Sequence, residues 1–268
     1  NLNTMDKGIA DAHSQLASIE INVKSFGAVG DGITDDGAAI RNAVEYARTK
    51  GSATIIIPKG IHLIASLNEN KSAIEVYSNI HFKGKGRDSV IKIGDNLISA
   101  SDFNCFAHQT RDDLVKNCTI TDLTIDMNGP NNIVTPELNV EGRNMRAIYI
   151  SYAENFKCDN VYFKDVSGRN AIVINNWYLS QGYKLSKNIK VLNSEFHNLG
   201  AACAGSEAQG DHTAIYITAD SFLIENCKFH NDNDALDYTN IITNAIETHS
   251  HHGVVENCTF KNVKTPFI

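Results

Sequence analysis

The sequence predicts a β-solenoid, a fold in which the chain winds into stacked coils of short strands. One observation is a strand-like unit, Ala-Ile followed by three more residues, that returns along the chain. The units start at Ala147, Ala171, Ala214 and Ala245. A second observation is an Asn-x-x-Phe step after each unit, with asparagines at Asn160, Asn193, Asn226 and Asn257, separated by 33, 33 and 31 residues. Repeats of this length built from strands rather than helix pairs are typical of solenoids.

Composition supports a single continuous fold and excludes several classes of protein. The chain has 268 residues, of which 42% are hydrophobic and 21% are charged, as in ordinary folded soluble proteins. No apolar run approaches about 20 residues, so we expect no membrane insertion. The net charge of −7 argues against a nucleic-acid partner.

Six cysteines occur without any Cys-x-x-Cys spacing. Cys227 and Cys258 follow Asn226 and Asn257, so they occupy one position in consecutive repeats. Equivalent positions predict small buried side chains stacked in a core, in a chain folded in a reducing cytoplasm. A disulfide framework or a zinc knuckle is the alternative.

The first 20 residues form a separate predicted unit. Apolar residues spaced three and four apart mark a heptad seam: Leu2, Met5, Ile9, Ala12, Leu16 and Ile19. We expect residues 1–20 to form a short coiled-coil stem, and we expect a homotrimer because parallel solenoids bundle in threes in fibrous spikes. A helix packed on its own domain is the alternative.

A strand, a loop and a capping helix are predicted next. Residues 21–26 alternate as a strand, and residues 27–32 are rich in turn-forming glycines. Thr34 is the expected N-cap of a helix over residues 34–50, with Asp35 and Asp36 in its first turn. Its apolar face consists of Ala39, Ile40, Ala43, Val44 and Ala47. This helix is suited to cover the open end of the solenoid.

The same stretch carries a family resemblance. The run Phe26-Gly27-Ala28-Val29-Gly30-Asp31-Gly32, with Thr34-Asp35-Asp36 and Ala39-Ile40, resembles the N-terminal motif of the pectate-lyase-like right-handed parallel β-helix superfamily. Gly37 and Arg41 depart from the residues often found there. The resemblance implies an all-β, right-handed parallel β-helix over residues 21–268. It implies little about chemistry, because lyases, polygalacturonases, epimerases and phage tailspikes share the motif.

Further strands are predicted over residues 53–57, 61–65, 73–77 and 80–83. Loops over residues 128–141 and 200–210 interrupt the repeats, and such insertions shape the binding face of a solenoid. The chain ends at Ile268, one strand into a further coil and without a capping pattern. We therefore expect the native protein to continue beyond this point.

Strand alternation predicts two outward-facing columns of side chains. The Ile of each unit and the residue two later should face the core, whereas the Ala and the residues two and four later should face outward. The first column is Glu75, Tyr149, Val173, Tyr216 and Glu247, and the second is Tyr77, Ser151, Asn175, Thr218 and His249. Side chains in one column should lie roughly 5 Å apart.

Candidate catalytic residues gather in the last complete repeat. Glycosidic hydrolysis uses two carboxyl groups that flank the scissile bond. We expect Glu247 to pair with Asp234 or Asp237, with Asp211 close to the preceding repeat and His249 as a proton shuttle. Solvent-exposed outer-face residues and an ordinary polar turn are the alternatives for these acids.

Substrate-binding candidates flank this group. Aromatic rings stack on sugars, polar residues bind hydroxyl groups, and arginines bind acidic groups. The candidates are Tyr216, Tyr149, Thr218, Asn175, Trp177, Arg143 and Arg146. Neither His249, His251 and His252 nor Asp232, Asp234 and Asp237 have the spacing of a defined zinc or calcium site, so we predict no metal and no cofactor.

Together these features predict a phage tail appendage that binds and cleaves a cell-surface polysaccharide or teichoic acid. The heptad stem makes the whole chain resemble a phage tailspike or preneck appendage, which implies location in the virion. Hydrolysis is favoured over elimination, because no Arg or Lys base is evident near Glu247. A non-catalytic adhesin, and a stand-alone pectate-lyase-like lyase or epimerase, are the alternatives. Fold by itself does not decide between them.

Overall fold

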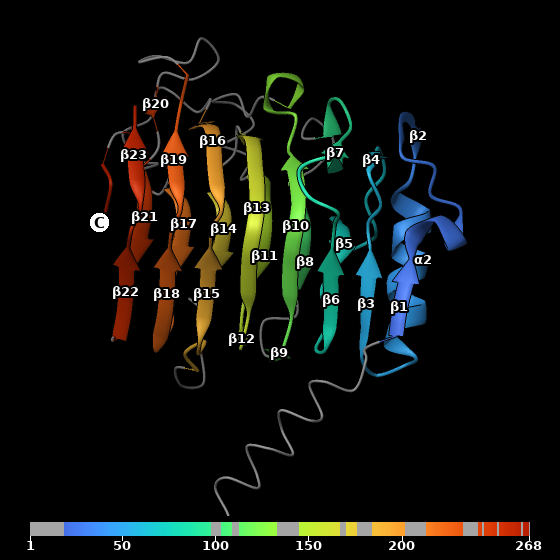
Figure 1. The fold of residues 1–268 in the computed structure, drawn as a ribbon, viewed down its shortest axis with the longest axis horizontal. Helices are drawn as coiled ribbons and strands as arrows, with labels where there is room; N and C mark the ends of the chain where they lie inside the picture. Colours follow the sequence, from blue (N-terminus) through green and yellow to red (C-terminus); the bar gives the residue numbers. More distant parts are fainter. Residues whose placement is uncertain are drawn as a thin grey trace, which may run out of the picture.

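The computed structural model shows parallel strands stacked as successive coils (Figure 1). It describes residues 19–97, 103–108, 113–132, 145–166, 170–175, 184–201, 213–232, 241–242, 244–250, 252–263 and 265–267. In these ranges the strands form one sheet of 15 strands, one of six and one of two. The predicted parallel β-helix is therefore present. The predicted stem lies outside the described residues, except that Ile19, the last position of its seam, is the first residue of β1.

Sheet A is the 15-stranded sheet, and it has two rows. One row runs in the order β1 (Ile19–Asn22), β3 (Ala53–Ile56), β6 (Ile80–Lys83), β10 (Thr119–Asp126), β13 (Lys157–Val166), β15 (Ile189–Leu192), β18 (Ser221–Glu225) and β22 (His252–Glu256). The second row contains β2 (Asp31–Asp35), β4 (Gly60–Ile64), β7 (Ser89–Ile93), the second halves of β10 and β13, β16 (Glu195–Ala201), β19 (Lys228–His230) and β23 (Thr259–Lys261). β20 (Ile241–Ile242) pairs antiparallel with β16.

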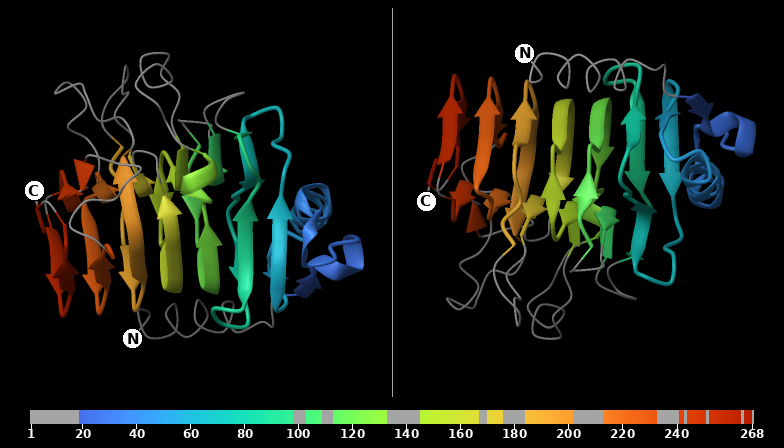
Figure 2. Two further views of the ribbon diagram at one scale, coloured as in Figure 1. Left: turned by 90° about the horizontal axis from the view of Figure 1, so that it is seen from above. Right: turned by 90° about the horizontal axis from the view of Figure 1, so that it is seen from below.

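Sheet B is the six-stranded sheet behind it (Figures 1 and 2). Its strands are β5 (Ser72–Glu75), β8 (Phe103–His108), β11 (Met145–Ile150), β14 (Asn170–Ile174), β17 (Thr213–Ile217) and β21 (Asn244–Thr248). A small third sheet joins β9 (Val115–Lys116) to β12 (Ala153–Glu154). The predicted strands between residues 53 and 83 are confirmed to within two residues at each end.

The four Asn-x-x-Phe steps that define the repeat each mark a sharp bend of the chain. Asn160, Asn193, Asn226 and Asn257 all have φ between 50° and 56°, a left-handed conformation that asparagine tolerates well. The amide of Asn226 donates to the side-chain oxygen of Asn193 at 3.2 Å, and Asn193 donates to Asp159 at 2.8 Å. These bonds hold equivalent bends of neighbouring coils in register.

The phenylalanines of the same step stack inside the core. Phe163, Phe196, Phe229 and Phe260 lie with successive ring centroids 4.7, 4.7 and 5.2 Å apart and nearly parallel. The first three are buried, and Phe260 is partly buried on the last described coil. The Asn-x-x-Phe step therefore consists of a bend followed by a core position.

The buried cysteines agree with the predicted role as core fillers. Cys105, Cys118, Cys158 and Cys227 are buried and Cys258 is partly buried, each as a free thiol. Cys203 lies outside the described residues. Burial raises the pKa of the Cys105 and Cys118 thiols, so they stay protonated at neutral pH.

The N-terminal segment differs from the prediction at two places. Residues Val23–Phe26 form a 3₁₀ turn, η1, rather than the end of a strand, because the chain must turn toward the helix. The helix itself, α2, spans Gly37–Arg48, so Thr34 is not its N-cap. Thr34 belongs to β2 and donates its hydroxyl hydrogen to Asp31, whereas Asp35 accepts from the backbone N–H of Gly37.

The helix α2 lies at the N-terminal end of the stack, level with β1 and against β5 and β3 (Figure 1). Its buried face includes Ile40, Ala43, Val44 and Ala47, which belong to the same core as the strands. Gly37 and Arg41, the two residues that depart from the superfamily motif, fit together in the structure. Arg41 donates to the carbonyl oxygens of Ser66 and Ala73 at 2.9 and 3.2 Å. A Cβ at Gly37 would lie 2.9 Å from the Arg41 guanidinium, so glycine leaves it room.

Asp36 of the superfamily motif is a buried acid with a structural role. Its carboxylate accepts from the backbone N–H groups of Val29 and Gly30 at 2.7 and 2.9 Å. The same carboxylate lies 2.7 Å from Nδ1 of His62, and both side chains are at most 1% exposed. Asp36 therefore ties the glycine turn to β4 rather than serving the helix dipole.

No helix in the described ranges is long and apolar enough to cross a membrane.

Candidate functional site

The first predicted column exists on the outer face of sheet B. Parallel pairing aligns Glu75 with Ala107, Tyr149, Val173, Tyr216 and Glu247 in six consecutive strands. Ala107 was not predicted, because β8 lacks the Ala-Ile unit. The prediction that the alanines of the repeat face outward is wrong. These residues are at most 2% exposed and belong to the core: Ala73, Ala147, Ala171, Ala214 and Ala245. Strict alternation therefore fails at this position, where the alanine and the isoleucine that follows it are both buried.

The second column continues beyond the strand ends. The backbone N–H groups of Asn175, Thr218 and His249 donate to carbonyl oxygens of the preceding coil at 2.8 to 3.2 Å. These bonds extend the ladder by one residue past each strand. They bring His249 beside Thr218, as the repeat predicts.

Glu247, His249 and Tyr216 form a compact group on the last two coils. Nε2 of His249 lies 3.0 Å from Oε1 of Glu247, and the His249 ring centroid lies 5.3 Å from that of Tyr216. The Glu247 side chain is 13% exposed and that of His249 is 46% exposed. The predicted juxtaposition of these three side chains is therefore confirmed. A carboxylate and an imidazole at this distance can exchange a proton.

Two polar atoms beside this group are buried without a partner among the described residues. They are Oγ1 of Thr218 and Oδ1 of Asn175. A buried oxygen without a hydrogen bond is costly, so such atoms point to a further bonding group. Both residues were predicted to bind substrate.

An arginine and a tyrosine lie two coils nearer the N-terminal end of the column. The guanidinium carbon of Arg146 lies 5.2 Å from the ring centroid of Tyr149, and the Ser151 hydroxyl lies 3.4 Å from the Tyr149 hydroxyl. Arg146 was predicted as a cation for acidic groups, and it does reach this face.

Five other predicted residues lie outside the described ranges: Asp211, Asp234, Asp237, Trp177 and Arg143. The pairing of two carboxyl groups around Glu247 therefore stays a prediction.

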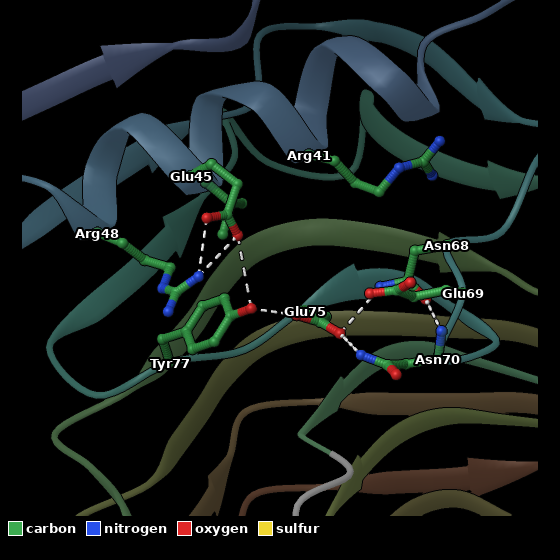
Figure 3. Close-up of a pocket in the computed structure, with 9 residues that line it drawn as sticks. Arg41, Glu45, Arg48, Asn68, Glu69, Asn70, Glu75 and Tyr77 are labelled. Atoms are coloured by element: carbon green, nitrogen blue, oxygen red, sulfur yellow. Dashed lines mark hydrogen bonds and ion pairs between the residues drawn. The ribbon is translucent and has the colours of Figure 1, made fainter.

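A cavity of about 460 Å³ opens at the other end of the column, between α2 and β5 (Figure 3). Glu75 and Tyr77 lie on its sheet side, and Arg41, Glu45 and Arg48 lie on its helix side. The Arg48 guanidinium carbon lies 4.0 Å above the Tyr77 ring. The repeat predicts Glu75 and Tyr77 on this face. It does not predict Arg41 and Arg48, because nothing in the repeat shows which face of the helix meets β5.

Hydrogen bonds fix the charges in this cavity. Burial acts to raise the pKa of Glu75, but hydrogen bonds from Tyr77, Asn70 and Asn68 outweigh it and lower that pKa. Burial, followed by the hydrogen bond to Glu75, raises the pKa of Tyr77. At neutral pH Glu75 is therefore an anion and Tyr77 a neutral donor. Both suit binding of hydroxyl groups more than proton transfer.

A second group of polar residues on sheet A was not predicted. The residue after each stacked phenylalanine faces outward, which aligns Lys164, His197, His230 and Lys261 in one row. The Phe-His pairs at 196–197 and 229–230 were the signal that could have revealed it.

Comparison with known proteins agrees with this architecture. The sequence model of the family described as "Rhamnogalacturonase A/epimerase, pectate lyase-like" matches residues 20–267. Among curated proteins, mannuronan C5-epimerase AlgE2 of Azotobacter vinelandii is 33% identical over 115 residues, which is 42% of this chain and 11% of that protein. The plasmin and fibronectin-binding protein A of Streptococcus pneumoniae is 28% identical over 76% of this chain and 27% of its own length.

Solved structures share the fold at low sequence identity. The tailspike protein of E. coli bacteriophage HK620, solved with a pentasaccharide, has a TM-score of 0.69 and 17% identity over 90% of this chain and 40% of the tailspike. A putative glycosyl hydrolase from Parabacteroides merdae has a TM-score of 0.56 and 18% identity, covering 92% and 96% of the two chains. With the family model matching nearly the whole sequence, the chain belongs to the rhamnogalacturonase A/epimerase family of pectate lyase-like proteins.

Proposed function

We propose that this protein binds a cell-surface glycopolymer along the outer face of sheet B and cleaves it by acid/base chemistry at Glu247. The observation that carries the proposal is the contact of Glu247 with His249 beside the ring of Tyr216. A partly shielded carboxylate supplies the acid or base, His249 relays the proton, and Tyr216 stacks on a sugar ring. Asp234, Asp237 or Asp211 supplies the second carboxyl group.

The rest of the column acts as the binding track. Tyr149 and Arg146 lie two coils below Tyr216, and Thr218 and Asn175 present buried oxygens to sugar hydroxyl groups. The cavity around Tyr77 and Glu75 receives a sugar unit at the far end. A polymer lying across several coils would contact each of these groups in turn.

For the biological context we propose a homotrimeric tail appendage of a phage, with residues 1–18 as its coiled-coil stem, because Ile19 and Glu20 belong to β1, and with α2 as the cap of the solenoid. Support comes from the shared fold with a tailspike whose structure contains a pentasaccharide. Teichoic acid or a related wall polymer is the proposed substrate. Light scattering should give a trimer for the chain and a monomer after removal of residues 1–18.

A lyase or epimerase activity is the second candidate. The curated mannuronan C5-epimerases favour it, as does Arg146 next to Tyr149, because a cation beside a phenol can hold a sugar carboxylate near a proton donor. This candidate predicts action on uronic acid polymers rather than on teichoic acid.

One assay separates these functions. Purified teichoic acid, a neutral polysaccharide and a uronic acid polymer are each incubated with the protein and sized by chromatography. New reducing ends indicate glycosidic hydrolysis, and new phosphomonoester ends indicate phosphodiester hydrolysis. Unsaturated ends indicate elimination, and altered sugar signals by NMR at constant length indicate epimerisation. We expect Glu247→Gln to lose activity and the exposed Glu256→Gln on β22 to keep it. Full activity of Glu247→Gln would contradict the catalytic assignment, and bound but unaltered polymer would indicate an adhesin.

A further inference from the structure

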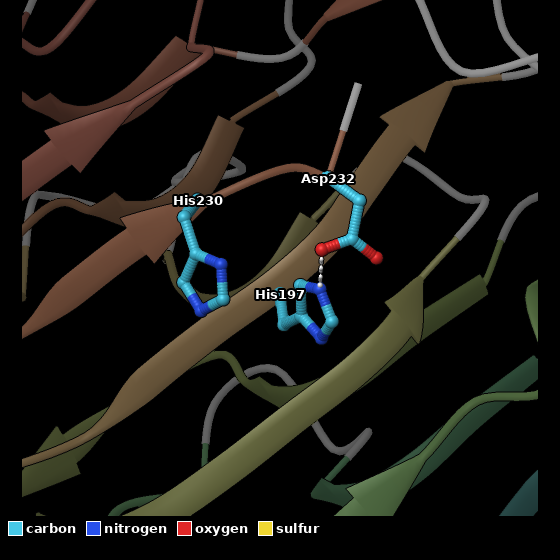
Figure 4. A group of neighbouring side chains, drawn as sticks. All are labelled: His197, His230 and Asp232. Carbon is cyan, nitrogen blue, oxygen red and sulfur yellow. Dashed lines mark hydrogen bonds and ion pairs between the residues drawn. The ribbon is translucent and has the colours of Figure 1, made fainter.

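Two stacked histidines and an aspartate form a cluster on the outer face of sheet A (Figure 4). The rings of His197 on β16 and His230 on β19 have centroids 4.4 Å apart and an interplanar angle of 19°. Nε2 of His197 lies 2.8 Å from Oδ1 of Asp232. One nitrogen of each ring and a carboxylate oxygen of Asp232 lie within 4.8 Å of one another. The cluster belongs to a different sheet from Glu247 and His249.

Neighbouring side chains fix the remaining ring nitrogens. The Tyr162 hydroxyl lies 2.5 Å from Nδ1 of His197. Oε1 of Glu195 lies 2.9 Å from Nε2 of His230. Glu195 is itself paired with Arg87, whose guanidinium carbon lies 4.3 Å above the Tyr162 ring. Each histidine therefore has an outer partner that sets the ring orientation.

The outer partners leave three donor atoms for a ligand. Nδ1 of His197 and Nε2 of His230 face these outer partners, so the atoms that a ligand would use are Nδ1 of His230 and the pair formed by Nε2 of His197 and Oδ1 of Asp232, which now contact each other. In Figure 4 a ring nitrogen of His230 faces the side of Asp232. Histidines that bind metals usually use one nitrogen for the metal and the other for a carboxylate, carbonyl or similar partner. The arrangement here has that form for both rings.

We propose that His197, His230 and Asp232 bind a divalent transition-metal ion of the Zn²⁺ class, with water completing the coordination. Two imidazoles and one carboxylate form a donor set suited to Zn²⁺, Co²⁺ or Ni²⁺ and poorly suited to Mg²⁺ or Ca²⁺, which prefer oxygen donors. Tetrahedral Zn²⁺ requires ligand atoms about 3.3 Å apart. The three present atoms lie within 4.8 Å of one another, and Oδ1 of Asp232 is 2.8 Å from Nε2 of His197, so binding of the ion requires small shifts of the two imidazole rings as well as of the Asp232 side chain, which is 60% exposed.

This inference departs from the expectation that the protein has no metal site. The ligands His197 and His230 are 33 residues apart, one full coil, so they follow the repeat rather than the short spacing of a metal-binding motif. Only the parallel pairing of β16 with β19 places them side by side. A bound ion would join these two coils and should stabilise their stacking, independently of catalysis on sheet B.

Calorimetric titration of the tag-free full chain with Zn²⁺ tests the proposal. We expect one ion per chain, with affinity reduced at least about tenfold in each of His197→Ala, His230→Ala and Asp232→Asn. Tyr162→Phe removes an outer partner only, so we expect a smaller loss. His252→Ala is the matched control, because His252 is an exposed histidine on β22, which pairs with β18 rather than with β16 or β19. The affinity of this variant should equal that of the unmodified protein.

Two further measurements keep the test independent of folding defects and of enzymatic activity. Co²⁺ in place of Zn²⁺ should give visible absorption bands of a low-coordinate nitrogen and oxygen site, absent in His197→Ala. At a hundredfold excess of Zn²⁺ over Kd, the Tm of the unmodified protein should rise by about 5 to 8 °C, and that of His230→Ala should not. Absence of binding, or equal binding by both histidine variants with native circular dichroism, would overturn the proposal.

Discussion

His249, the first residue after β21, lies next to Glu247 on the outer face of sheet B, with 3.0 Å between its Nε2 and the carboxylate Oε1. The two residues are two positions apart in an extended segment, so alternation alone puts them on one face. Tyr216 comes from the coil before and pairs with Glu247 across the sheet. The candidate site therefore combines a local pair with one neighbour supplied by stacking.

Tyr216 should contribute to polymer binding rather than to proton transfer. We expect Tyr216→Ala to weaken binding by about 1 to 2 kcal/mol, or roughly 5- to 30-fold in Kd, because the stacking surface is lost. Tyr216→Phe should keep most of the affinity. Affinity electrophoresis or calorimetry measures the change, and Tyr46→Ala on the exposed face of α2 is the control. Equal losses for both alanine variants would contradict a specific role.

His249 can be tested for proton transfer separately from positioning. His249→Gln keeps a donor near Glu247 but cannot carry a proton, so we expect turnover to fall about 100-fold with polymer binding unchanged. If His249 only positions Glu247, the glutamine variant should stay active and His249→Ala alone should fail. Initial rates and Kd measured on the same polymer distinguish these cases.

Glu75 should make stability depend on pH. Its folded pKa is below the ordinary value of 4.5, because hydrogen bonds from Tyr77, Asn70 and Asn68 outweigh the opposing effect of burial. A lowered pKa means that the stabilisation is present above about pH 4.5 and is lost as the pH falls through the folded value. Thermal unfolding of Glu75→Gln should therefore differ most from the unmodified protein at neutral pH, and the two curves should converge in acid. The exposed neighbour Glu69→Gln should follow the unmodified protein throughout.

Asp36 should be essential for the first coils. Asp36→Ala leaves His62 and two backbone N–H groups buried without their acceptor, so we expect a loss of about 3 to 5 kcal/mol in the free energy of unfolding. Denaturant titration measures it. Asp31→Ala is the comparison, because Asp31 is exposed and bonded only within its own turn. A loss no larger than that of Asp31→Ala would show that the buried pair is dispensable.

The phenylalanine stack should dominate the stability of the later coils. Phe196→Ala removes a ring packed on both sides by Phe163 and Phe229, and we expect a cost of about 3 to 5 kcal/mol. Phe260 is partly buried and has one described ring neighbour, Phe229, so Phe260→Ala should cost less. Denaturant unfolding of both variants checks the order, and a reversed order would contradict the packing argument.

Much of the repeat could be read from the sequence because its rules are local. A left-handed bend favours asparagine at Asn193 and Asn226 whatever the surroundings, and the phenylalanine three residues later then falls in the core. The same alternation correctly predicted Tyr149, Tyr216 and Glu247 as one column. The alternation failed at Ala147 and its equivalents, which are buried although the isoleucine that follows each of them is buried too. The strand predicted over residues 21–26 gives way at Val23 to a 3₁₀ turn.

The sequence by itself determined the repeat, the outward column of sheet B and the family motif, because each depends on residues a few positions apart. The tertiary structure decided which coils lie in contact and in what register. It alone placed Arg48 over Tyr77, buried Asp36 against His62, and stacked His197 on His230. The physical reason is that these contacts join residues about 30 apart, where the length of each intervening coil sets the alignment and no local conformational preference records it.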